Sequence, residues 1–157
     1  MTLNRAAIDA AYSAVLSHVS ATGQFQTING HEPLSTPVLS GVAAAQWAAY
    51  LGPAIGSGLS QTSALLVLNV RVQSLATGDR LTLDAMDPRL LTATSAVLTR
   101  LIGDLTLGGT VRCIDVRGMS GKRLEANAGY MEQNKTMQRV MVITVPIIIN
   151  DAWAEVA

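Results

Sequence analysis

The residues that could perform catalysis are few and widely separated. The two histidines, His18 and His31, lie in a predicted helix and in a proline-flanked loop, and no His-x-x-x-His or Glu-x-x-His spacing accompanies them. The single cysteine, Cys113, excludes an internal disulfide and a cysteine-built metal site. It falls in an alternating segment, where a small strand residue is expected. We therefore expect no catalytic residues, no metal and no cofactor, and surface positions for both histidines.

A glycine-rich basic loop is the segment that comes nearest to a binding motif. The sequence RGMSGKR places Arg117, Lys122 and Arg123 together in a chain of which only 14% is charged. It is not a phosphate-binding loop, because the spacing is wrong and Arg123 stands where Ser or Thr would bind magnesium. Two interpretations stay open: a solvated turn, and a loop that faces DNA or a neighbouring protein ring.

The composition indicates one folded domain, residues 1–157, with an unusually neutral surface. Hydrophobic residues make up 49% of the chain, and 11 basic residues balance 11 acidic ones. Zero net charge argues against a dedicated nucleic-acid binder, which is normally basic. A surface poor in charge is typical of one covered by neighbouring subunits. No segment reaches the ~18 apolar residues of a membrane helix, and the N-terminus lacks a signal-peptide pattern, so we expect assembly in the cytosol.

Two segments have the periodicity of amphipathic helices. The first runs from Asn4 to Val19 with Asn4 as N-cap, and Gly23 follows its end. The second runs from Asp87 to Ile102, with Asp87 as N-cap and Pro88 at the first helical position. Their predicted buried stripes are Ile8, Tyr12, Val15, Leu16 and Val19 in the first helix, and Leu90, Leu91, Thr94, Val97, Leu98 and Leu101 in the second.

The rest of the chain has the alternation and turn signals of strands. The alanine-rich segment VAAAQWAAYLGPAIGSG favours helix on propensity, but its alternation favours a strand. The predicted strands are 24–30, the alanine-rich segment, Ala64–Ser74, Thr110–Arg117, Arg123–Glu132 and Gln138–Ile149, with the last two joined as a hairpin by QNKT. The element order predicts an α+β fold with a mainly antiparallel sheet and helices packed on one face.

Two strands carry apolar residues on both faces, in the runs ALLVL and VPIII. A small domain seldom covers both faces of a sheet, so we expect an exposed apolar patch that marks an interface. Pro146 lies inside the second run and cannot donate a ladder hydrogen bond, which predicts an edge strand or a bulge. These features suit a subunit of a closed ring.

Several segments in a fixed order carry a family resemblance. They are GSGLSQTSALLVLNVRVQS, DAMDPRLLTATSAVLTRLIGD, LGGTVRCIDVRG, LEANAGY and RVMVITVPIIINDAW. From Ile8 to Trp153 the chain resembles the tail terminator proteins of siphovirus-type phages, which are functional relatives of the lambda minor tail protein U. The resemblance implies a non-enzymatic α+β subunit that forms a hexameric ring. Such rings cap the head-proximal end of the tail tube, end its polymerisation and join it to the head.

The resemblance also implies where the protein works and what it contacts. Its partners would be further copies of itself, the tail tube protein and the head–tail connector, and DNA would pass through the lumen without specific binding. It would be located in the neck of the virion, and in the host cytoplasm during assembly, with no membrane contact. Two alternatives stay open: a head completion or stopper protein of the neck, and a small ligand-binding or regulatory α+β domain.

Overall fold

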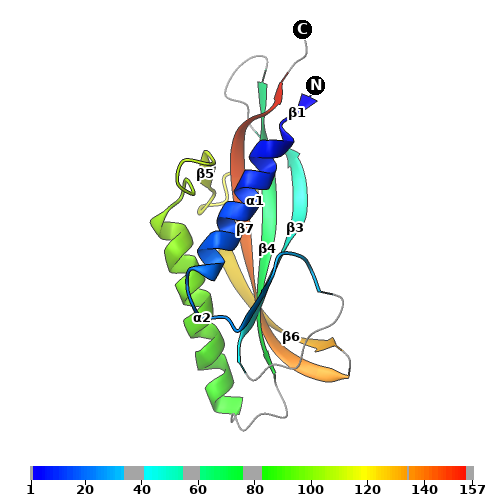
Figure 1. The fold of residues 1–157 in the computed structure, drawn as a ribbon, viewed down its shortest axis with the longest axis vertical. Helices are drawn as coiled ribbons and strands as arrows, with labels where there is room; N and C mark the ends of the chain where they lie inside the picture. Colours follow the sequence, from blue (N-terminus) through cyan, green and yellow to red (C-terminus); the bar gives the residue numbers. More distant parts are fainter. Residues whose placement is uncertain (1, 34–40, 55–60, 76–82, 134, 155–157) are drawn as a thin grey trace.

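The computed structural model describes residues 2–33, 41–54, 61–75, 83–133 and 135–154 (Figure 1). The elements follow the chain in the order β1 (Thr2–Leu3), α1 (Arg5–Ser20), β2 (Thr27–Asn29), β3 (Ala43–Pro53), β4 (Gln61–Leu75), α2 (Leu83–Gly103), β5 (Cys113–Ile114), β6 (Glu125–Gln133) and β7 (Thr136–Ala154). No helix in these ranges is long and apolar enough to cross a membrane.

One mixed, mostly antiparallel sheet is built around the long strand β7. On one side β7 pairs with β4 along most of its length, and on the other side it pairs in turn with β6, β5 and β1. Strand β3 pairs with β4, and the short β2 adds a parallel contact to β3. Both helices pack against the sheet and against each other on the same face (Figure 1). The predicted α+β class and the final hairpin are therefore confirmed.

The core lies between the two helices and the sheet face that they cover. The sheet contributes the even-numbered residues of β4 and the odd-numbered residues of β7, as alternation requires. The main residues of this core are Ile8, Ala11, Val15, Val19, Leu66, Leu68, Val70, Val72, Leu90, Ala93, Val97, Leu101, Ile143, Val145 and Ile147. One member of the predicted stripes is wrong: Leu91 is 55% exposed, because each helical residue turns about 100° from the last and Leu90 already faces the core.

The two predicted helix caps have different outcomes. The Oδ1 atom of Asn4 accepts a hydrogen bond from the backbone N–H of Ala7 at 3.2 Å, so this N-cap is confirmed. The cap at Asp87 is wrong, because α2 begins at Leu83 and Pro88 lies inside it. The Asp87 carboxylate instead accepts hydrogen bonds of 2.9 and 3.4 Å from the guanidinium of Arg139 on β7.

This contact predicts how Asp87 and Arg139 respond to mutation. The carboxylate ties α2 to β7, so Asp87→Ala should destabilise the protein only while Arg139 is present. In an Arg139→Gln background the same change should have little further effect, because the pair is one interaction. Thermal unfolding of the four combinations measures this coupling. A helix cap would give additive effects, and additivity would contradict the assignment.

Several strand boundaries differ from the predicted ones, and two of the smaller changes are that β4 begins at Gln61 instead of Ala64 and β6 at Glu125 instead of Arg123. Only Cys113–Ile114 of the predicted strand 110–117 is a strand, because residues 104–112 form consecutive turns in which Leu107, Gly108 and Gly109 have positive φ. The predicted strand 24–30 shortens to Thr27–Asn29. Strand β7 continues past Ile149 to Ala154. The alanine-rich segment is a strand from Ala43 to Pro53, as predicted. Residues 55–58 of that segment and Asn134 of the predicted QNKT turn lie outside the described residues.

Pro146 lies neither at an edge of the sheet nor at a bulge of the β4–β7 ladder, whose register shifts only between Thr62 and Ala64, so that prediction is wrong. It is buried in β7, opposite Val67 of β4 and between the stretches that pair with β6 and β5. Its carbonyl accepts from the Asp115 N–H at 2.8 Å, and the Asp115 carbonyl accepts from the Leu124 N–H at 3.1 Å. In a regular ladder residue 146 would donate that second bond. The proline is tolerated because the backbone N–H of Leu124, between β5 and β6 in the chain, donates to the Asp115 carbonyl in place of the N–H that proline lacks.

The sheet face away from the helices is less exposed than the sequence predicts. Leu65 and Val67, on the face away from the helices, are only 6% and 3% exposed. Exposed large apolar side chains lie elsewhere. Two groups of them are Tyr50 and Leu51 on β3, and Leu105, Val116 and Met119 in the turns that flank β5; the others lie on α2, β6 and β7.

Candidate functional site

A buried carboxylate organises the basic loop. Asp115 is 5% exposed and directly follows β5. Its two oxygens accept hydrogen bonds from the backbone N–H groups of Gly118, Met119 and Ser120 at 2.8, 3.1 and 2.7 Å, and from the Ser120 hydroxyl at 2.6 Å. Gly118 and Gly121 have φ values of 82° and 96°, which favour glycine. The loop is therefore a built turn with a fixed shape.

These hydrogen bonds also determine the protonation of Asp115. Burial of the carboxylate raises its pKa, but the hydrogen bonds from Ser120, Met119 and Gly118 together outweigh that effect, and the pKa lies below its ordinary value. An ionised carboxylate whose oxygens are already occupied by donors is poorly suited to act as a general base. Its role is to hold the loop.

The loop and β5 form one wall of an open, mostly apolar groove of about 690 Å³. Its floor is formed by three residues on neighbouring strands, Leu65 of β4, Ile148 of β7 and Cys113 of β5, with Ile148 paired between the other two. The other lining residues are Pro53, Ala54, Leu105, Arg112, Ile114, Asp115, Val116, Arg117, Met119 and Ser120. Met119 at the tip of the loop is 87% exposed, so the groove has an apolar rim.

The three predicted basic residues share this loop but not one role. Arg117 is exposed and lines the groove, and Lys122 is exposed nearby. The guanidinium of Arg123 donates instead to Glu125 at 2.7 Å. The pKa of Glu125 is lowered chiefly by that hydrogen bond. Since Asp115 and Glu125 offset much of the positive charge, the loop would attract an anion only weakly.

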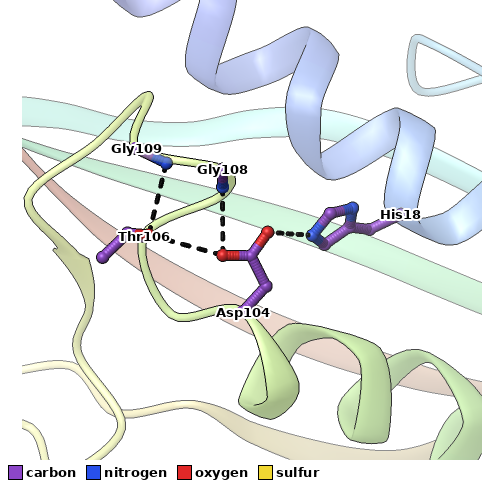
Figure 2. A network of polar contacts seen from close by, with 5 residues as sticks. All are labelled: His18, Asp104, Thr106, Gly108 and Gly109. Atoms are coloured by element: carbon purple, nitrogen blue, oxygen red, sulfur yellow. Dashed lines mark hydrogen bonds and ion pairs between the residues drawn. The ribbon is translucent and has the colours of Figure 1, made fainter.

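His18 belongs to a separate polar network between α1 and the turn after α2 (Figure 2). Its Nε2 lies 3.2 Å from Oδ2 of Asp104, and the His18 side chain is only 21% exposed, which corrects its predicted surface position. Oδ1 of Asp104 accepts hydrogen bonds from the Gly108 N–H at 3.0 Å and from the Thr106 hydroxyl at 3.4 Å. The hydrogen bond from Gly108 is the main reason why the pKa of Asp104 is lowered. His31 is exposed, as predicted.

Neither cluster has the geometry of a catalytic site. The hydroxyl in this network is that of Thr106, and it donates to the Asp104 carboxylate instead of facing the imidazole (Figure 2). Cys113 is partly buried in the groove, and no histidine is among the lining residues there. In the described ranges no three His, Cys, Asp or Glu residues gather as metal ligands. The groove is suited to binding an apolar surface.

Comparison with known proteins assigns no family to this chain. No family model matches it, and no curated protein does. Function therefore has to be inferred from the residues and their arrangement.

Sequence reasoning missed Asp115 and Asp104, the two carboxylates that shape the turns on either side of β5. Both could have been found from local patterns, because each is followed within four residues by glycine, in DLTLGG and DVRG. An aspartate that accepts backbone N–H groups a few residues later is a common turn device. The groove itself leaves no such local signal, since its floor comes from three separate strands.

Proposed function

We propose that this chain is a structural, non-enzymatic virion protein that works as a ring, most simply of six copies, at the head-proximal end of a phage tail tube. The observation that carries the proposal is the exposed apolar rim of the groove, formed by Leu105, Val116 and Met119. A charge-poor apolar surface of this kind is typical of a protein–protein interface. The ordered motifs that resemble tail terminators supply the identity of the partners.

The proposed mechanism follows from the symmetry of a ring. Closed rotational symmetry buries the same contact on every copy and leaves two different annular faces. One face would bind the last ring of tube protein and the other would bind the head connector. Tube growth would stop because the exposed face no longer offers the surface to which tube protein adds. The weakly charged loop with Arg117 would let DNA pass without holding it.

Tube length is the direct measure of this function. Tail tube protein polymerised with this protein should give tubes that end in a ring and do not lengthen further. Tube protein alone should continue to polymerise. A Met119→Asp variant should fold like the wild type, because the residue is 87% exposed, but should cap tubes poorly. The proposal would be contradicted by tubes that grow equally long with and without the protein and show no terminal ring in micrographs.

A stopper protein of the neck is the nearest alternative function. It would also form a ring, but on the head connector and not on the tube. Micrographs of the protein mixed separately with tubes and with connector-bearing heads would separate the two, since only a terminator should cap isolated tubes.

The groove gives specific support to one further candidate, a ligand-binding α+β domain. Its volume of about 690 Å³ and its apolar lining are typical of small-molecule sites. This candidate predicts a monomer that binds an apolar compound and loses that binding in Ile148→Trp, which would fill the floor. Tube capping by a ligand-free protein would argue against it.

A further inference from the structure

Strand β3 has a free backbone edge over its second half. Strand β2 pairs with β3 only at Ala43–Ala45, and the Tyr12 hydroxyl donates to the Gln46 carbonyl at 2.8 Å. Beyond Gln46, no other strand in the described residues pairs with this side of β3. Tyr50 and Leu51 are 50% and 43% exposed there. The outer edge of residues 47–53, the β3 edge, is therefore apolar and has no strand partner among the described residues.

Little in the sequence protects the β3 edge from pairing. Proteins usually guard such edges with charged residues, prolines or bulges. Here no Asp, Glu, Lys or Arg occurs from Pro33 to Val70. The available devices are a bulge between Ala48 and Tyr50 and the terminal Pro53. An uncharged, exposed edge is expected to add a strand from another chain.

The sheet offers a second unpaired edge on its opposite side. Strand β6 pairs with β7 on one side, and no strand in the described part of the chain pairs with the other. This β6 edge exposes Asn127, Ala128 and Tyr130, the last of which is 63% exposed. Among the described residues, each copy therefore has two different free edges.

The strand directions make these two edges complementary. Strand β3 is antiparallel to β4, β4 to β7, and β7 to β6, so β3 and β6 run in opposite directions. Two copies in the same orientation, placed side by side, would bring the β3 edge of one against the β6 edge of the next as an antiparallel pair. Along the strand direction, the free part of β3 is level with residues 144–149 of β7, whereas β6 is level with residues 136–144. Pairing would therefore tilt the strands, as the closure of a sheet into a barrel also does.

We propose that the β3 edge of one copy pairs head-to-tail with the β6 edge of the next, so that the sheet continues from subunit to subunit. This inference rests on the proposed ring and names the surface that would form it. Head-to-tail contacts use two different patches and can close into a ring, whereas β3-to-β3 pairing could only give dimers.

Backbone direction identifies variants that block one edge and spare the ladders inside the subunit. In a strand, residues two apart direct their backbone N–H and C=O to the same side. The Gln46 carbonyl accepts from Tyr12 on the side of β3 away from β4, so the N–H of Ala48 also faces away from β4. The Pro146 carbonyl points toward Asp115, so the backbone N–H and C=O of Thr144, two residues away, point to the same side, toward Glu125 of β6. The backbone groups of Glu125 therefore face β7. Those of Ala128, three residues further on, face the opposite way, toward the free edge. Ala48→Pro and Ala128→Pro therefore each remove an outward donor.

Mixing these two variants tests the proposal by sedimentation at the highest soluble concentration. The wild type should self-associate, each variant alone should be monomeric, and the 1:1 mixture should give a dimer through its one intact pair of edges. Leu51→Lys should also be monomeric. The matched control Leu91→Lys, on the exposed face of α2, should associate like the wild type. Far-ultraviolet circular dichroism checks that each variant is folded.

Three results would overturn the inference. They are a folded Ala48→Pro or Leu51→Lys variant that associates normally, an Ala128→Pro variant that still associates alone, and a wild type that stays monomeric throughout. If Ala48→Pro does not fold, Leu51→Lys decides for the β3 edge, and Ala128→Lys replaces Ala128→Pro in the same way. None of these results would touch the tube-capping proposal, because tube length is measured separately and a ring could use another surface.

Discussion

Leu90→Ala should lower the free energy of unfolding by about 2–5 kcal/mol, whereas Leu91→Ala should change it by less than about 0.5 kcal/mol. The two leucines are adjacent in α2 and undergo the same substitution. They differ in environment, because Leu90 is 1% exposed within the core and Leu91 is 55% exposed. Truncation of Leu90 removes buried methyl groups and leaves a cavity between α2 and the sheet. Truncation of Leu91 removes groups that already contact solvent.

Urea unfolding measures both effects with one protocol. Leu90→Ala should move the midpoint to lower urea concentration without a change in slope, which is the behaviour expected when stability alone changes. Leu91→Ala should superimpose on the wild type. Equal losses in the two variants would contradict the helix orientation, since both side chains would then have to be buried.

Asp115→Ala should lower the free energy of unfolding by about 1–3 kcal/mol. The substitution removes the acceptor of three backbone N–H groups and empties the buried position around which the loop is built. Asp115→Asn keeps the side-chain shape and one acceptor oxygen, so it should lose less. Amide hydrogen exchange should show lost protection at Gly118, Met119 and Ser120, while β7 keeps its own. Unchanged protection of the loop in Asp115→Ala would contradict this role.

The same carboxylate should contribute to acid unfolding. Because the pKa of Asp115 is lowered in the folded protein, its stabilising effect is fully present above the ordinary value of 3.8 and is lost as the pH falls through the folded value. The wild type should therefore lose more stability than Asp115→Ala between about pH 5 and the acid end of the titration. Parallel stability curves for the two proteins would show that Asp115 has no such linkage.

The sequence by itself determined the features that depend on local chemistry. Helical periodicity placed α1 and the body of α2, and Asn4 caps α1 because an N-cap needs only its own next few residues. Alternation placed β3, despite its alanines, as well as β4 and the final hairpin. The α+β class followed from the order of these elements. Each of these properties is encoded within a window of a few residues.

Tertiary structure decided the features that depend on residues far apart in the chain. Asp87 matched a cap pattern, yet Arg139 on β7 binds it inside the helix. Pro146 matched an edge pattern, yet Leu124 supplies the donor that lets the proline lie inside the sheet. The groove and the two free edges arise only when β3, β4, β5, β6 and β7 are placed side by side. Local propensity is weak beside hydrogen bonds and strand packing between distant parts of the chain, so the assembled sheet decides the final arrangement.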